Sequence, residues 1–136
     1  YLVMATEKGL IKKTELEAYA NPRKGGIIGI TLEEGDSLMG VSLTDGNEEI
    51  ILATREGKAI RFKEKESRPM GRSAKGVRAI RLGKKDVVIG MVVARKEATL
   101  LTISEKGFGK RTPIEEYRLQ SRGGKGIWYK IRKHVD

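Results

Sequence analysis

Residues 120–126 read QSRGGKG and place Arg122 and Lys125 around three glycines. Cationic side chains can neutralise a phosphate group, and glycines let that phosphate come close to the main chain. The same composition also suits a tight turn between two strands, with charged residues as its neighbours. Which of these two roles applies depends on the elements that position the loop.

The glycines of this loop belong to an internal repeat. Gly26, Gly76 and Gly126 recur every 50 residues, within the segments KGGIIGITL, AKGVRAIRL and GKGIWYKIR. A second series closes short polar turns that follow apolar runs: Gly9, Gly57 and Gly107. The chain therefore reads as one repeat domain with units 1–49, 50–98 and an incomplete 99–136.

Each unit predicts β-strands, because its segments are short, rich in Ile, Val, Leu and Thr, and bounded by Gly, Asp and Asn. About four strands in a unit of ~50 residues is typical of a propeller blade. The apolar run VVIGMVVA, residues 87–94, predicts an innermost strand. Residues 112–117, TPIEEY, predict one short helical turn capped by Thr112. We expect an all-β, propeller-like domain of about 2.7 blades.

Such a partial ring leaves sheet edges open, which predicts a partner surface, self-association through the blade edges, or further sequence. The chain begins at Tyr1, inside an apolar run and without an initiator Met. We therefore expect it to be an open fragment of something longer.

The net charge of +10, from 28 Lys and Arg against 18 Asp and Glu, predicts a polyanionic partner. The three units carry net charges of −4, +9 and +5, so the polyanion should lie mainly on the second and third. Aromatic residues make up only 5% of the chain, which disfavours single-stranded nucleic acid and favours a duplex. Few side chains suit base edges, so we expect sequence-tolerant contact with the DNA backbone.

Cations recur at two fixed places in the repeat, and equivalent places on successive blades would form a ribbon of charge. One set comes four residues after the hairpin glycines: Lys13, Arg61 and Arg111. The other surrounds the 50-residue glycine series: Arg23, Lys24, Arg72, Lys75, Arg122 and Lys125. The full set of expected DNA contacts is Lys13, Arg23, Lys24, Arg61, Arg72, Lys75, Arg78, Arg111, Gln120, Arg122, Gly123, Gly124, Lys125 and Gly126.

No catalytic or metal-binding motif stands out. Gly71 and Gly76 have the spacing of a phosphate loop, but Val77 follows where lysine is needed. The chain has no cysteine, and its one histidine, His134, has no second ligand to share a metal, so we expect no metal site. No apolar run approaches the roughly 20 residues that span a bilayer, so a cytoplasmic protein without membrane contact is expected.

Four segments resemble the C-terminal domain of DNA gyrase A, and together they cover nearly the whole chain: GLIKKT, GIIGITLEEGDSLMGVSLTDGNEEIILATREGKAIRF, RPMGRSAKGVRAI and GFGKRTPIEEYRLQSRGGKGI. The resemblance implies a β-pinwheel, a ring of usually six four-stranded blades that exchange strands and wrap DNA on a basic rim. The family's gyrase box is Gln-Arg-Arg-Gly-Gly-Lys-Gly. Residues 120–126 match it except at Ser121, as in the degenerate copy of a later blade.

The resemblance also implies a mechanism. The domain would bend a DNA segment and present it to the cleavage gate of the topoisomerase, so that ATP-driven strand passage introduces negative supercoils. The catalytic tyrosine, and the use of ATP and magnesium, would belong to other domains and to a second gyrase polypeptide. This chain would then be no enzyme by itself and would need no cofactor. Its partners would be duplex DNA, the rest of gyrase A and gyrase B, in the bacterial cytoplasm.

Two alternatives stay open. The related C-terminal domain of topoisomerase IV, from the counterpart of gyrase A, typically lacks an intact box. A propeller-like scaffold could instead bind another protein at its edges, its charge serving solubility.

Overall fold

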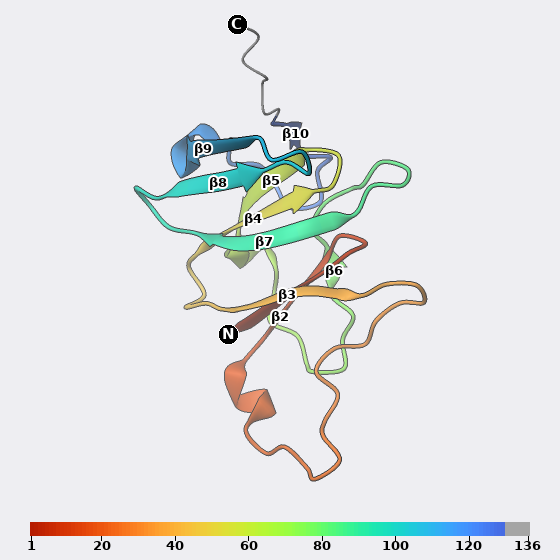
Figure 1. Ribbon diagram of the computed structural model, residues 1–136. Coiled ribbons are helices and arrows are strands. Elements are labelled where there is room, and N and C mark those ends of the chain that lie inside the picture. Colours follow the sequence, from red (N-terminus) through yellow and green to blue (C-terminus); the bar gives the residue numbers. More distant parts are fainter. Residues whose placement is uncertain (130–136) are drawn as a thin grey trace, which may run out of the picture.

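The computed structural model describes residues 1–129; His134 and the end of the third unit lie outside this range. The described chain is built from β-strands and three short 3-10 turns (Figure 1). None of the helical segments in this range has the length and apolar character needed to cross a membrane. The predicted all-β class is therefore confirmed.

Every repeat starts with an antiparallel hairpin, because an apolar run, a polar turn and a second strand follow one another. The hairpins are β1 (Leu2–Thr6) with β2 (Leu10–Thr14), β4 (Glu49–Thr54) with β5 (Lys58–Lys63), and β8 (Thr99–Ile103) with β9 (Gly109–Pro113). The turn glycine adopts a positive φ each time, for example +98° at Gly57, where a side chain would be strained.

A 3-10 turn follows each hairpin: η1 (Leu16–Tyr19), η2 (Glu64–Glu66) and η3 (Ile114–Glu116). The helical turn expected in residues 112–117 is present, but the cap predicted at Thr112 is wrong. Thr112 and Pro113 still belong to β9 and pair with Leu100 and Thr99. The turn therefore begins one residue later than predicted, at Ile114, and no side chain caps it.

Neighbouring repeats exchange strands. β3 (Leu38–Leu43) and β7 (Val88–Ala94) complete one side of their own repeat's hairpin. The short strands β6 (Val77–Arg78) and β10 (Ile127–Trp128) cross to the hairpin of the preceding repeat. The sheet orders are β3-β1-β2-β6 and β10-β5-β4-β7, with β8-β9 as a two-stranded third sheet.

The first two sheets pack face to face around one apolar core. Its buried side chains come from both sheets: Val3, Ala5, Ile11, Ile50, Leu52, Ile60, Phe62, Ala79, Ile80 and Val88. A smaller cluster joins the second sheet to the third hairpin: Ile51, Ala59, Ile114 and Tyr117. The burial of these side chains on both faces explains why the strands read as apolar runs.

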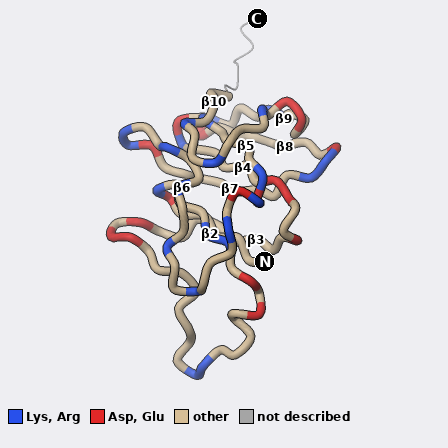
Figure 2. Tube along the Cα trace, turned by 180° about the vertical axis from the view of Figure 1, so that it is seen from behind, with Lys and Arg blue, Asp and Glu red and all other residues tan. Residues whose placement is uncertain are grey.

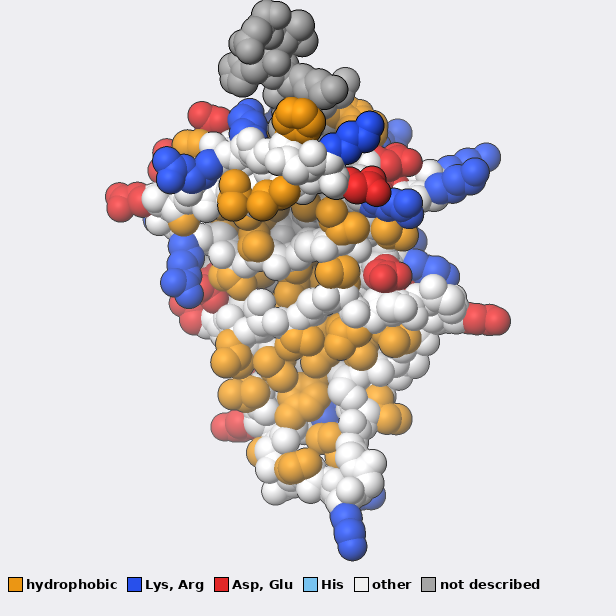
Figure 3. Space-filling view, in the orientation of Figure 1, with side chains coloured by type: hydrophobic (Ala, Val, Ile, Leu, Met, Phe, Trp, Pro, Cys, Tyr) orange, Lys and Arg blue, Asp and Glu red, His pale blue; other side chains and the backbone are white. Residues whose placement is uncertain are grey.

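Strands β3, β7 and β8 leave an apolar surface exposed. In Figure 3, hydrophobic side chains gather over β3, β7 and β8, which lie at the front in Figure 1. The exposed large side chains on these strands are Leu38, Val41, Leu43, Ile89, Leu101 and Ile103.

The repeat also leaves two of its pairing positions unused within residues 1–129. Residues 27 and 28 stand where β6 and β10 stand one and two repeats later, yet they form no strand, and Ile28 is 61% exposed. At the other end, β9 has β8 as its partner, and no strand from the described residues pairs with its other side. The free side of β9 is an open sheet edge of the kind that the partial ring predicts, whereas residues 27 and 28 are a segment without a strand partner.

Candidate nucleic-acid interface

Two glycine-containing loops from successive repeats, residues 23–29 and 70–76, lie side by side on the outside of the first sheet. The main-chain N–H of Thr31 donates to the carbonyl of Ala74 at 3.3 Å, and Arg72 Nη1 donates to the carbonyl of Ile28, also at 3.3 Å. Figure 2 shows cations at the tip of the lowest loop and along its neighbour. The predicted residues Arg23, Lys24 and Lys75 are exposed there.

Lys12 holds these two loops together from below. Its side chain is completely buried, and its Nζ donates hydrogen bonds to the carbonyls of Gly29 in one loop and Arg72 in the other. Tyr19 donates its hydroxyl to the same Gly29 carbonyl at 2.8 Å. Burial, and secondarily the nearby Arg72 charge, lowers the pKa of the Lys12 ammonium below its ordinary value.

Sequence reasoning missed Lys12, although a signal was available. Leu10, Lys12 and Thr14 share one face of β2, while Ile11 and Lys13 share the other. Two consecutive lysines in a strand that is buried on both faces must each find partners inside the protein.

The loop at residues 120–126 is bound to the second repeat through the predicted contact Arg122. Its Nη1 donates to the carbonyl of Arg78 at 2.6 Å, and its Nε donates to the carbonyl of Glu66 at 3.1 Å. Its main-chain N–H reaches Glu66 Oε1, also at 3.1 Å. The arginine of the box-like loop therefore has a structural role, whereas Lys125 is exposed.

The remaining predicted residues of this loop have mixed surroundings. Gln120 is half-buried, and its main-chain N–H donates to the carbonyl of Arg61 at 2.7 Å. Gly123 donates to the carbonyl of Ala79, also at 2.7 Å. Gly124 accepts from the N–H of Arg81 at 2.8 Å, and Gly126 lies against the main chain of Ala59. The presence of these glycines is therefore explained by the main-chain contacts of the turn between strands, before any contact with DNA is considered.

Replacing Arg122 by alanine should lower the free energy of unfolding by about 1–2 kcal/mol, because two carbonyls lose a charged donor. Lys125→Ala should change it by less than about 0.5 kcal/mol, since its side chain is exposed. Urea denaturation followed by circular dichroism measures both. Equal effects of the two substitutions would contradict the structural role of Arg122.

The column of cations after the hairpin glycines does not form the ribbon that the repeat predicts. Lys13 is 4% exposed, and its Nζ lies 3.8 Å from Glu64 Oε1 and 4.8 Å from the centre of the Tyr1 ring. Arg61 donates its Nε to Glu49 at 2.6 Å and its Nη1 to the carbonyl of Tyr117 at 2.9 Å. These two side chains support the fold, and we leave them out of the interface.

Two further predicted residues, Arg78 and Arg111, are exposed. Arg78 lies on β6, next to the loop at residues 70–76, and Arg111 lies on β9. The outward-facing members of the predicted set are thus Arg23, Lys24, Lys75, Arg78, Arg111 and Lys125, with Arg72 half-buried.

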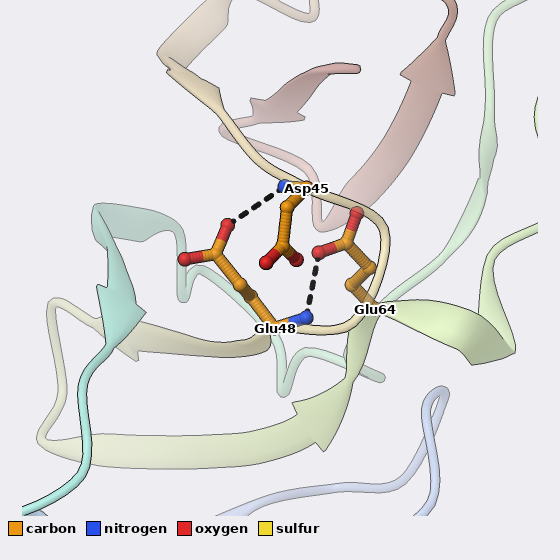
Figure 4. A group of neighbouring side chains, drawn as sticks. All are labelled: Asp45, Glu48 and Glu64. Atoms are coloured by element: carbon orange, nitrogen blue, oxygen red, sulfur yellow. Dashed lines mark hydrogen bonds between the residues drawn. The ribbon is translucent and has the colours of Figure 1, made fainter.

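Three carboxylates, Asp45, Glu48 and Glu64, come within 4.8 Å of one another (Figure 4). They hold the turn before β4. Glu48 Oε2 accepts from the N–H of Asp45 at 3.0 Å, and Glu64 Oε2 accepts from the N–H of Glu48 at 2.9 Å. Asp45 Oδ1 accepts from the N–H of Asn47 at 2.8 Å. The geometry is that of a turn whose main-chain donors are satisfied by acidic side chains.

Strand-exchanged four-stranded blades with cationic loops on their outer side define a propeller-like repeat protein. The family model described as the DNA gyrase C-terminal domain, beta-propeller, matches residues 1–45, 48–95 and 98–127. The chain belongs to this family.

Individual proteins agree with that assignment. DNA gyrase A of Pseudomonas aeruginosa is 47% identical over 127 residues, which is 93% of this chain and 14% of that protein. A crystal structure of the C-terminal domain of DNA topoisomerase IV matches with a TM-score of 0.89 and 30% identity, over 94% of this chain and 40% of that one. A DNA gyrase A C-terminal domain matches with a TM-score of 0.83 and 27% identity, over 93% and 42%.

Proposed function

We propose that this chain binds duplex DNA on its outer loops and bends it, as the DNA-wrapping module of a bacterial gyrase A. The observation that carries the proposal is the pair of cationic loops from successive repeats, which lie side by side on a fold of the gyrase C-terminal family. Cations on adjacent blades can contact successive phosphates of one duplex and stabilise its curvature.

The activity of the whole enzyme would come from elsewhere. The chain spans 14% of the length of its gyrase relative, so strand cleavage, strand passage and the use of ATP and magnesium are assigned to other domains of gyrase A and to gyrase B. The chain itself would supply DNA geometry and no catalytic group. Its partners would then be duplex DNA and the remainder of the gyrase complex, in the bacterial cytoplasm.

Topoisomerase IV is the less favoured origin. The matching family model is that of gyrase, and gyrase A relatives are 45% and 47% identical in sequence. The two solved domains, from topoisomerase IV at 30% and gyrase A at 27%, are similarly distant from this chain. A protein-binding scaffold is the candidate from another class, and a DNA-binding experiment separates the two functions.

An electrophoretic shift with linear duplex DNA at low salt tests the proposal. We expect retardation by the wild-type chain, and at least tenfold weaker binding after Arg23→Glu with Lys24→Glu, because a charged contact becomes a repulsion. The matched control is Arg95→Glu with Lys96→Glu, which changes the net charge equally at exposed residues outside the loops. Equal losses in both variants would indicate a general charge effect and contradict binding at the loops.

A further inference from the structure

A pocket of about 350 Å³ opens between the two loops on the first sheet. Its lining comes from both loops: Arg23, Gly26, Ile27, Ile28, Arg72 and Ser73. The lining contains two arginines and no carboxylate. The side chain of Arg23 is exposed and has no hydrogen bond or ion pair within residues 1–129, so its guanidinium is available to a ligand.

Directly behind the walls of this pocket lies the buried ammonium of Lys12. It bonds to the carbonyl of Arg72, which lines the pocket, and to that of Gly29, the neighbour of Ile28. No ion pair of Lys12 occurs in the described part of the chain, although a buried charge is costly unless it is compensated. An anion in the pocket would supply that compensation.

A second pocket, in the next repeat, gives a partial contrast, because its lining includes Arg122 and Gly123, the counterparts of Arg72 and Ser73. It is lined by the loop at residues 120–126 but also by Glu66, which accepts from the Arg122 N–H. Lys12 comes three residues after the hairpin glycine, and its counterpart in the second repeat is Ile60, an uncharged core residue. That pocket therefore contains its own negative charge and lacks the buried ammonium.

We propose that the pocket between residues 23–29 and 70–76 binds one phosphate group of the duplex backbone, and we call this pocket the phosphate seat. Lys12 is the positioning residue, because its ammonium holds together the two loops that form the pocket. The inference rests on the proposed function for the source of the phosphate. The chemistry of the seat itself, two guanidinium groups above a buried ammonium, suits any phosphate.

The salt dependence of duplex binding tests the seat. Each phosphate contact contributes about −0.9 to the slope of log affinity against log salt. Lys12→Met and Arg23→Gln should each make the slope shallower by about 1, and the double variant should also change it by about 1, because both residues serve the same phosphate. The control Arg95→Gln should leave the slope unchanged.

A purely structural role for Lys12 gives a different result. The melting temperature of Lys12→Met would fall while its slope stayed at the wild-type value, and that outcome would overturn the proposal. Additive changes in the double variant would also overturn it. Should Lys12→Met fail to fold, Arg23→Gln still tests the proposal, because Arg23 is exposed and its substitution should leave the fold intact. An unchanged salt slope in Arg23→Gln would exclude the phosphate seat.

A titration with inorganic phosphate, followed by NMR, tests the pocket without DNA. We expect saturable chemical-shift changes at the amides of Gly26 and Ser73 when inorganic phosphate is added. These changes should be absent in Lys12→Met and absent when duplex DNA is already bound to the wild-type chain. Phosphate-dependent changes that persist with duplex DNA bound would assign the pocket to free phosphate and overturn the site for the DNA backbone. No changes at all would overturn the phosphate site altogether. A wild-type chain that binds phosphate here but no duplex would overturn the proposed function and the DNA backbone as the source of the phosphate, and would leave only a site for free phosphate.

Discussion

Glu64→Ala should lower the free energy of unfolding by about 3–5 kcal/mol, because it leaves the buried ammonium of Lys13 without its carboxylate. Glu64 is 1% exposed, and its Oε1 lies 3.8 Å from Lys13 Nζ. The same carboxylate accepts from Thr44 Oγ1 at 2.5 Å and from the N–H of Glu48 at 2.9 Å. One substitution thus removes a charge partner and two hydrogen-bond acceptors. Urea denaturation of the purified chain measures the effect.

A double substitution separates the effect of the lost charge pair from the effect of lost packing. Lys13→Met with Glu64→Leu removes both charges and should recover at least about 1 kcal/mol of the loss, since buried pairs can often be replaced by apolar groups. A Glu64→Ala variant within about 1 kcal/mol of wild type would contradict the buried role that the structure gives this residue.

Gly76→Ala should cost about 3 kcal/mol of stability, because the new side chain meets two obstacles. Gly76 has φ +97°, a conformation that residues with a side chain rarely adopt. An added Cβ would also overlap the carbonyl oxygen of Ile11 on β2, where the exchanged strand β6 pairs. Thermal or urea denaturation gives the loss directly.

Two other glycines provide graded controls. Gly26 has φ +83° but nothing within 4 Å of an added Cβ, so Gly26→Ala should cost only the backbone strain, about 1 kcal/mol. Gly71 lies in open space without a positive φ, so Gly71→Ala should cost less than about 0.5 kcal/mol. Equal losses at Gly26 and Gly76 would mean that close approach to β2 does not explain the second glycine.

The sequence predicted the all-β class and its hairpins well, because their signals are local. Turn glycines at a fixed phase and short apolar runs indicate hairpins without any knowledge of what packs against them. The exchange of strands came from the resemblance to the family, since no local pattern says that Val77 pairs with Ile11 rather than within its own repeat. The capping error at Thr112 arose because a strand and a 3-10 turn compete for the same residues.

The burial of the cations after the hairpin glycines was not predicted, for a physical reason. Cations that recur at one position of the repeat are expected to line up on the surface. Where the strand that carries them is buried on both faces, however, some of these side chains point into the protein. Lys13 finds Glu64, which is 51 residues away in the sequence, and Arg61 finds carbonyls of the next repeat. The role of Lys12 follows only from the structure, because its ammonium donates to carbonyls in two loops from different repeats. Long-range partners of this kind have no signature within a single repeat.

The affinity for linear duplex DNA as a function of salt tests the central claim most directly. If the outward-facing cations neutralise about six phosphates, log affinity should fall linearly with log salt at a slope of about −5. The slope should be the same for duplexes of unrelated sequence, because backbone contacts carry no base information. Absence of binding at low salt, or a slope shallower than about −2, would contradict a DNA-wrapping surface on these loops.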